Sequence, residues 1–228
     1  MAHIDLETAF DISETRTKVL SGTSRRDRFR VLRFQPQGWW NDSQGGWVFS
    51  PGLSLGLKAF GAMSENNPVA SRPGADPNFI KFRVDVKRVQ TMPWSTQAVL
   101  DLTGQLSTSK LTPSDELSLG GATGVRGYPE GDYLADQGVV ARFDYLVPLF
   151  FLPGGWRTVA FIDRGYGHLR AVTGEERSSR NPMGVGVGLV FLGSKGLTAR
   201  VEWGFSVGDD PLTDDSHSRV HLRIEQNF

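Results

Sequence analysis

Apolar and charged residues alternate one by one along several segments of this 228-residue chain. In residues 79–89, for example, Ile80 and Phe82 alternate with Lys81 and Arg83. Successive side chains of an extended strand point to opposite faces, so this period places charged residues on one face and apolar residues on the other. The alternation therefore predicts two-faced β-strands.

The same period recurs along the chain and predicts about ten strands, with no competing helical segment. Within 183–192, Gly184, Gly186 and Gly188 occupy one face, where another backbone could approach closely. The predicted strands are 2–11, 28–39, 46–57, 79–89, 95–107, 137–147, 156–166, 183–192, 197–207 and 219–228.

The connections between these segments alternate between long and short. Outer-membrane barrels have long extracellular loops and short periplasmic turns, so the alternation predicts an all-β, antiparallel transmembrane β-barrel with both termini in the periplasm. The long connections are 12–27, 58–78, 108–136, 167–181 and 208–217, and the short ones lie near 40–45, 91–94, 148–155 and 193–196.

Composition agrees with a barrel and removes several other classes of protein. No segment approaches the roughly 18 apolar residues of a transmembrane helix, whereas a barrel strand needs only about ten alternating residues. With 25 Lys and Arg against 25 Asp and Glu, the formal net charge is zero, so we expect no nucleic-acid partner. The chain has no cysteine, and we expect neither a metal nor a cofactor.

The two ends of the chain lead to separate expectations. Phe228 closes a strand with an alternating apolar face, and a terminal aromatic there would lie in the interfacial girdle of a barrel. It resembles the C-terminal insertion signal of outer-membrane barrels, which implies two partners, the barrel-assembly machinery and outer-membrane lipid. The N-terminal residues Met1–Asp5 lack the charged and apolar regions of a leader, so we expect the chain to be a fragment.

Two motifs stand out from the strand pattern. Val125-Arg126-Gly127-Tyr128 lies in the 108–136 connection, and Phe161-Ile162-Asp163-Arg164-Gly165 lies in the predicted strand 156–166. With them the chain resembles the two-partner secretion transporters, the TpsB family of haemolysin and adhesin exporters, within the superfamily of barrels preceded by POTRA domains. That resemblance implies a transporter, not an enzyme, whose partner is a secreted exoprotein.

The resemblance also implies how the motifs meet. The loop carrying Val125, Arg126, Gly127 and Tyr128 would fold back into the barrel, and Arg126 would pair with the carboxylate of Asp163. Arginine presents a planar fork of donors that can bind a carboxylate through two bonds. Phe161 and Asp163 lie two residues apart and therefore share one strand face, with Gly165 next along it.

The resemblance covers the chain from about residue 28 to its end and includes the 71–76 loop, Ser-Arg-Pro-Gly-Ala-Asp. The family barrel has sixteen strands, so the ten predicted here correspond to its C-terminal part. We expect residues 1–228 to form a single barrel domain, without the upstream strands and POTRA domains.

Other classes of function remain open at this point. Barrel hydrolases need histidine beside carboxylates, and Asp209, Asp210, Asp214 and Asp215 lie near His217, but a solvated acidic loop explains this cluster better. A porin, a soluble lipocalin-like barrel, an assembly factor and a patatin-linked barrel are the remaining alternatives. The remaining histidines are His3, His168 and His221.

Overall fold

The computed structural model is built almost entirely of antiparallel strands. No helix in the part of the chain that it describes is long and apolar enough to cross a membrane. It describes residues 2–18, 24–64, 67–170, 172, 177–212 and 216–226.

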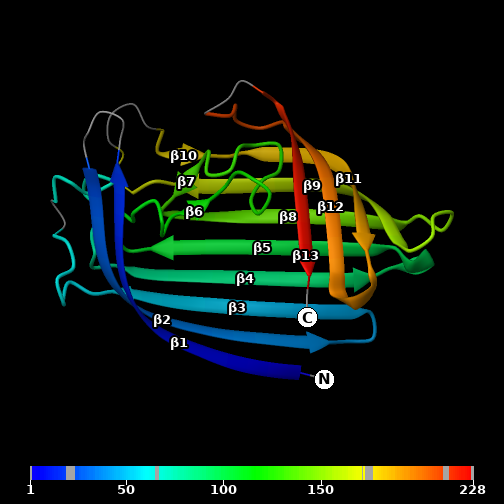
Figure 1. Cartoon of the computed structure of the whole chain (residues 1–228), viewed down its shortest axis with the longest axis horizontal. Helices are drawn as coiled ribbons and strands as arrows, with labels where there is room; N and C mark the ends of the chain where they lie inside the picture. The colour runs from blue at the N-terminus through cyan, green and yellow to red at the C-terminus, as the bar shows by residue number, and fades with distance from the viewer. Residues whose placement is uncertain are drawn as a thin grey trace.

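Ten strands form one curled antiparallel sheet and pair in chain order (Figure 1). All ten predicted strands are confirmed. Their bounds are β1 (Ala2–Lys18), β2 (Ser24–Asn41), β3 (Gly45–Gly56), β4 (Ile80–Thr91), β5 (Gln97–Ser107), β8 (Gln137–Pro148), β9 (Gly155–His168), β11 (Met183–Leu192), β12 (Leu197–Ser206) and β13 (Ser218–Gln226).

Short elements fill some of the connections. The two-residue strands β6 (Leu117–Ser118) and β7 (Leu134–Ala135) pair with each other inside the 108–136 connection, and β10 (Ser179–Arg180) pairs with the end of β9. The 3-10 turns η1 (Pro93–Ser95) and η2 (Ser194–Gly196) lie in two of the short connections. The alternation of long and short connections therefore holds from β2 onward.

The first connection is shorter than the sequence predicts. The sequence pattern predicts a loop over residues 12–27, but β1 and β2 pair continuously up to Lys18 and Ser24. Residues 12–18 are too polar to show the apolar alternation of a membrane-facing strand, yet the backbone ladder continues through them. Glu14 supports this extension by pairing with Arg16 and Arg26 at 2.7 and 2.9 Å.

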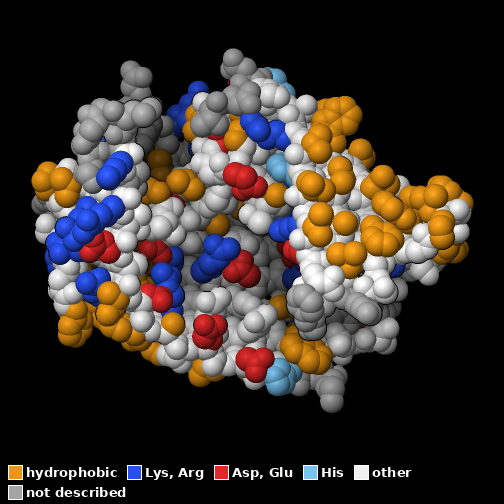
Figure 2. All heavy atoms as spheres, viewed as in Figure 1, with side chains coloured by type: hydrophobic (Ala, Val, Ile, Leu, Met, Phe, Trp, Pro, Cys, Tyr) orange, Lys and Arg blue, Asp and Glu red, His pale blue; other side chains and the backbone are white. Residues whose placement is uncertain are grey.

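The two faces of the sheet differ as the alternation predicts. On β13, Val220, Leu222 and Ile224 are each about two-thirds exposed, whereas on β4 Lys81 is buried on the opposite, concave side. Figure 2 shows hydrophobic side chains gathered over the β12 and β13 region and charged ones in the central hollow. In water so much exposed apolar surface would favour association, but it is what a lipid-facing wall requires.

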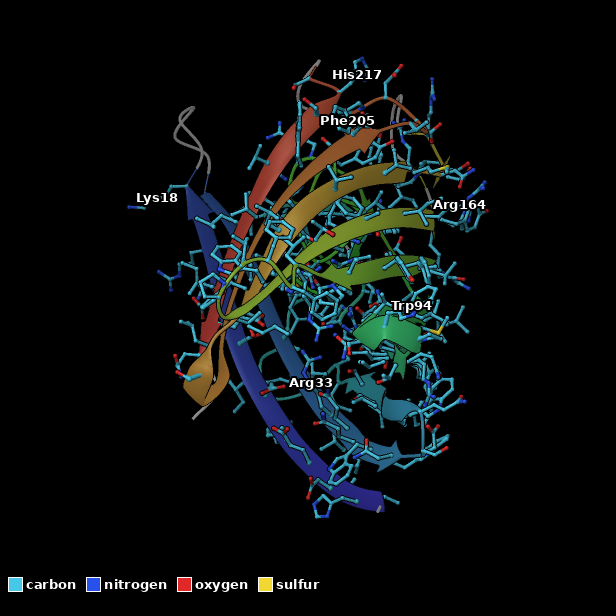
Figure 3. All side chains as sticks on the ribbon, turned by 90° about the vertical axis from the view of Figure 1, so that its right-hand side faces the viewer. Lys18, Arg33, Trp94, Arg164, Phe205 and His217 are labelled. Carbon is cyan, nitrogen blue, oxygen red and sulfur yellow. The ribbon has the colours of Figure 1, made fainter. Side chains whose placement is uncertain are left out.

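The concave side is occupied by connections as well as by wall side chains. Figure 3 shows the sheet curving around side chains that include Arg33 of β2. One buried cluster joins β2 to the 58–78 connection, and a second consists mainly of residues of the 108–136 connection. The second cluster contains Leu117, Leu119, Val125, Tyr128, Tyr133, Ala135 and Val140.

The sheet is open among the described residues. There β1 pairs with β2 alone and β13 pairs with β12 alone, so the two outer strands do not meet.

Candidate functional site

The 108–136 connection, here called the motif loop, folds into the concave side of the sheet. Its turn is closed by Val125, whose N–H donates to the carbonyl of Leu119 at 2.7 Å, while the N–H of Leu119 donates to Tyr133 at 2.8 Å. Val125 is completely buried. This fold brings the next residue, Arg126, against the inner wall.

Arg126 binds Asp163 of β9 through three hydrogen bonds. Its Nε donates to Oδ2 and its Nη2 to Oδ1, each at 2.7 Å, and its backbone N–H donates to Oδ2 at 3.0 Å. Both residues have no exposed surface. The structure thus places the two motifs in contact through the bidentate geometry that a guanidinium fork allows.

Two further carboxylates bind the same guanidinium. Nη1 of Arg126 donates to Oε1 of Glu202 on β12, and Nη2 donates to Oδ1 of Asp144 on β8, both at 2.6 Å. Asp144 and Glu202 are each 5% exposed. The loop is therefore fixed to three separate strands, and Asp144 and Glu202 are site residues that the sequence analysis missed.

Two wall arginines balance the extra negative charge. Nη2 of Arg200 lies 2.7 Å from both Asp144 and Glu202, and Nε of Arg142 lies 4.0 Å from Asp163. Three cations thus face three carboxylates. Arg142 also donates to the carbonyl of Thr123 in the motif loop at 3.3 Å.

The environment keeps Arg126 charged. Burial by itself would lower the pKa of Arg126, but its hydrogen bonds to Asp163 and the charges of Asp163, Asp144 and Glu202 raise that pKa above its ordinary value. The ring of Phe161 adds a further contact, with its centroid 3.6 Å from Cζ of Arg126. Such a cation–π contact is attractive where the cation is desolvated.

Glycines make room for the motif loop at the wall. A Cβ on Gly184 would lie 2.0 Å from the carbonyl oxygen of Arg126, and one on Gly204 would lie 2.7 Å from the nitrogen of Gly127. Gly127 itself has a φ of +99°, which favours glycine. The expected close backbone approach is therefore present at Gly184.

Tyr128 and Val125 add further contacts between the motif loop and its surroundings. The hydroxyl of Tyr128 donates to the carbonyl of Asp209 at 2.7 Å, which links the motif loop to the connection after β12. Val125 lies against Gly165, where a Cβ would come within 3.2 Å of its methyl group. All the residues of the two motifs named from the sequence thus lie in one region.

Phe228, the predicted insertion signal, lies outside the described residues, as do Asp214 and Asp215 of the acidic cluster near His217. Within the described ranges, no group of three histidine or acidic residues has the geometry to hold a metal ion. Asp209 instead accepts a hydrogen bond from the backbone N–H of Asn181 at 2.9 Å.

A comparison of the sequence with known families gives a match over most of the chain. The family model described as haemolysin secretion/activation protein ShlB/FhaC/HecB matches residues 24–191. No curated protein sequence matches significantly.

Solved structures share the fold. CdiB from Escherichia coli is 22% identical with a TM-score of 0.70, and CdiB from Acinetobacter baumannii is 14% identical with a TM-score of 0.72. Each match covers 98% of this chain but only 43% and 38% of the respective CdiB chains. The chain therefore spans less than half the length of these structures.

Proposed function

This chain belongs to the haemolysin secretion/activation protein family, whose members are outer-membrane β-barrel transporters, and we propose that it forms the C-terminal part of a two-partner secretion pore. Its substrate is a large exoprotein of the adhesin or haemolysin type. On this proposal, its ten strands correspond to the last ten of a sixteen-stranded barrel that follows POTRA domains.

One observation carries the proposal: a loop with a single buried arginine, Arg126, is fixed by three carboxylates on the inner wall. The pairing of Arg126 in the loop motif with Asp163 in the wall motif is what favours this function over a diffusion porin. A soluble lipocalin-like barrel would not expose the apolar side chains of β13. The family match favours the secretion branch over the assembly-factor and patatin-linked branches.

The arrangement supports a transport role for Arg126 and not a catalytic one. Its guanidinium is a permanent cation with no proton to exchange at neutral pH, and the carboxylates around it are occupied in binding it. We propose that this contact sets the position of the motif loop in the pore. Lipid then contacts the outer face, and the assembly machinery inserts the barrel through its C-terminal strand and Phe228.

A secretion assay tests the proposal. Cells that carry the intact transporter and the exoprotein encoded beside it should display or release that exoprotein, and cells from which the transporter gene is deleted should retain it in the periplasm. The deletion strain complemented with the intact gene is the control. Equal release with and without the transporter would contradict the proposed function.

A further inference from the structure

A second buried charge cluster lies away from Arg126, at the end of the sheet that carries the long connections. Its centre is Asp136, which directly precedes β8 and has no exposed surface. Arg72, from the connection after β3, donates from Nη1 to Oδ1 at 2.7 Å and from Nη2 to Oδ2 at 3.0 Å. The motif loop is therefore bound at its C-terminal base as well as at Arg126.

The same carboxylate binds two more connections. The backbone N–H of Leu111, at the start of the motif loop, donates to Oδ1 at 2.7 Å, and the backbone N–H of Arg170, after β9, donates to Oδ2 at 2.7 Å. Nη1 of Arg72 also donates to the carbonyl of Leu111 at 2.8 Å and pairs with the buried carboxylate of Glu116. Four donors from three connections thus converge on one side chain.

We infer that Asp136 is a positioning residue that joins described parts of the connections after β3, β5 and β9 into one hydrogen-bonded unit, here called the loop cap. The four hydrogen bonds to Asp136 link segments far apart in the sequence, and one carboxylate accepts all four. Removing that charge leaves Arg72 with Glu116 and the carbonyl of Leu111 as partners and weakens the two backbone hydrogen bonds from Leu111 and Arg170.

The loop cap has a consequence for export, which rests on the proposed function. A chain that leaves the pore must pass the end of the sheet where these connections meet. The Arg72–Asp136 contact then keeps the loop cap together and the base of the motif loop in place when nothing is being exported.

Cysteine labelling measures opening of the loop cap directly, because the chain has no cysteine of its own. Ala75→Cys is a suitable reporter, since Ala75 is fully buried in a cluster that also contains Leu111. Val159→Cys is a second reporter, buried in a separate cluster on β9 that reports unfolding of the wall. Each reporter is combined in the intact transporter with Asp136→Asn, with Arg72→Ala, and with Asp210→Asn as the matched control on an exposed aspartate.

Asp136→Asn and Arg72→Ala should each raise the labelling rate at position 75 by at least tenfold, because loss of one partner of a buried ion pair shifts such an equilibrium by on the order of 100-fold. The double variant should label no faster than the faster single variant, and Asp210→Asn should have no effect. Labelling at position 159 should stay slow throughout. A smaller rise at position 75, or equal rises at both positions, would overturn the inference. The assay needs no exoprotein, so such a result would leave the proposed function standing.

Discussion

Gly184 and Gly204 leave the space that the backbone of the motif loop occupies. A Cβ at Gly184 would collide with the carbonyl oxygen of Arg126, a backbone atom that cannot turn aside as a side chain can. The motif loop fits against the wall because two wall residues have no side chain there, as well as because the charges of the loop and the wall are opposite. Gly184 could be flagged from the sequence because it lies in an alternating glycine series, but its contact could not.

Gly184→Ala should therefore displace the motif loop while the sheet stays folded. The Arg126–Gly127 peptide bond lies between two residues that are buried in the unaltered protein. In the variant it would become accessible to trypsin, so limited digestion should give a new fragment that ends at Arg126. Gly52→Ala is the matched control, because the nearest atom to its added Cβ would lie 3.8 Å away. Protection of the Arg126–Gly127 bond in Gly184→Ala would contradict this account of the wall.

The roles of Glu202 and Asp144 as partners of Arg126 could not be predicted from the sequence. Each residue carries a charge on a strand face that also carries an arginine two residues earlier, which is an ordinary pattern for the inner face of a barrel. Only the spatial proximity of β8, β9 and β12 turns three separate carboxylates into one site. Arg126 and Asp163 were found because both lie in recognisable motifs.

Glu202→Gln should lower stability as well as displace the loop. A hydrogen bond to a charged group contributes about 1.5–3 kcal/mol, which corresponds to a fall of about 3–12 °C in the unfolding temperature of a domain of this size. The measurement is the temperature at which the barrel loses its compact migration on a gel. Glu225→Gln removes an exposed partner of Arg223 and is the control, since exposed ion pairs contribute about 0–1 kcal/mol. Equal shifts in the two variants would show that Glu202 is not in a buried network.

At the scale of strands and connections, the alternation of apolar and polar residues was sufficient to predict each strand that has one apolar and one polar face. The predicted boundaries of the ten strands agree within about two residues, except at the end of β1 and the start of β2. The polar ends of β1 and β2 were missed because nothing in their side chains marks them as strand, and their pairing comes from the backbone ladder. The two-residue strands β6, β7 and β10 depend on contacts within folded loops and leave no periodic pattern.

The connection lengths make a prediction about orientation. A cysteine introduced by Ser114→Cys, in the motif loop, should react with an impermeant thiol reagent added to intact cells, because Ser114 is exposed. One introduced by Ser194→Cys, in the short connection η2, is also exposed but should react only after the outer membrane is permeabilised. The opposite pattern would reverse the assigned orientation of the sheet.

The C-terminal strand makes a prediction about assembly. Deleting Phe228 should lower the yield of the intact transporter in the outer membrane and increase its degradation in the periplasm, because the aromatic girdle would lose its terminal anchor. Replacing Phe228 with Tyr keeps an aromatic ring and is the control. Normal insertion of the deletion variant would remove this role for Phe228.

At the scale of the whole molecule, a curled sheet surrounds a loop that three strands hold in place. The wall supplies a lipid-facing outer surface, and the inner surface supplies the charges that fix the loop. Burying charges costs free energy unless each is paired, and each carboxylate around Arg126 binds that cation. In the same network, Nε of Arg142 and Nε of Arg200 are buried without a hydrogen-bond partner among the described residues. The fold could be predicted from local periodicity, whereas the charge network depends on strand neighbours that periodicity does not specify.

On the proposed function, the contact between Arg126 and Asp163 holds the motif loop in a position required for secretion, and a double-mutant cycle measures this role most directly. In the intact transporter, Arg126→Ala and Asp163→Ala should each reduce exoprotein release at least about tenfold while the barrel still inserts, since breaking a buried pair costs about 3–5 kcal/mol. Arg126→Ala should be the more severe, because it also leaves Asp144 and Glu202 without this partner. Arg126→Lys should restore release only in part, since an ammonium cannot reproduce the planar fork. The double variant should be no worse than Arg126→Ala alone, whereas fully additive losses would show that the two residues act independently and would contradict the claim.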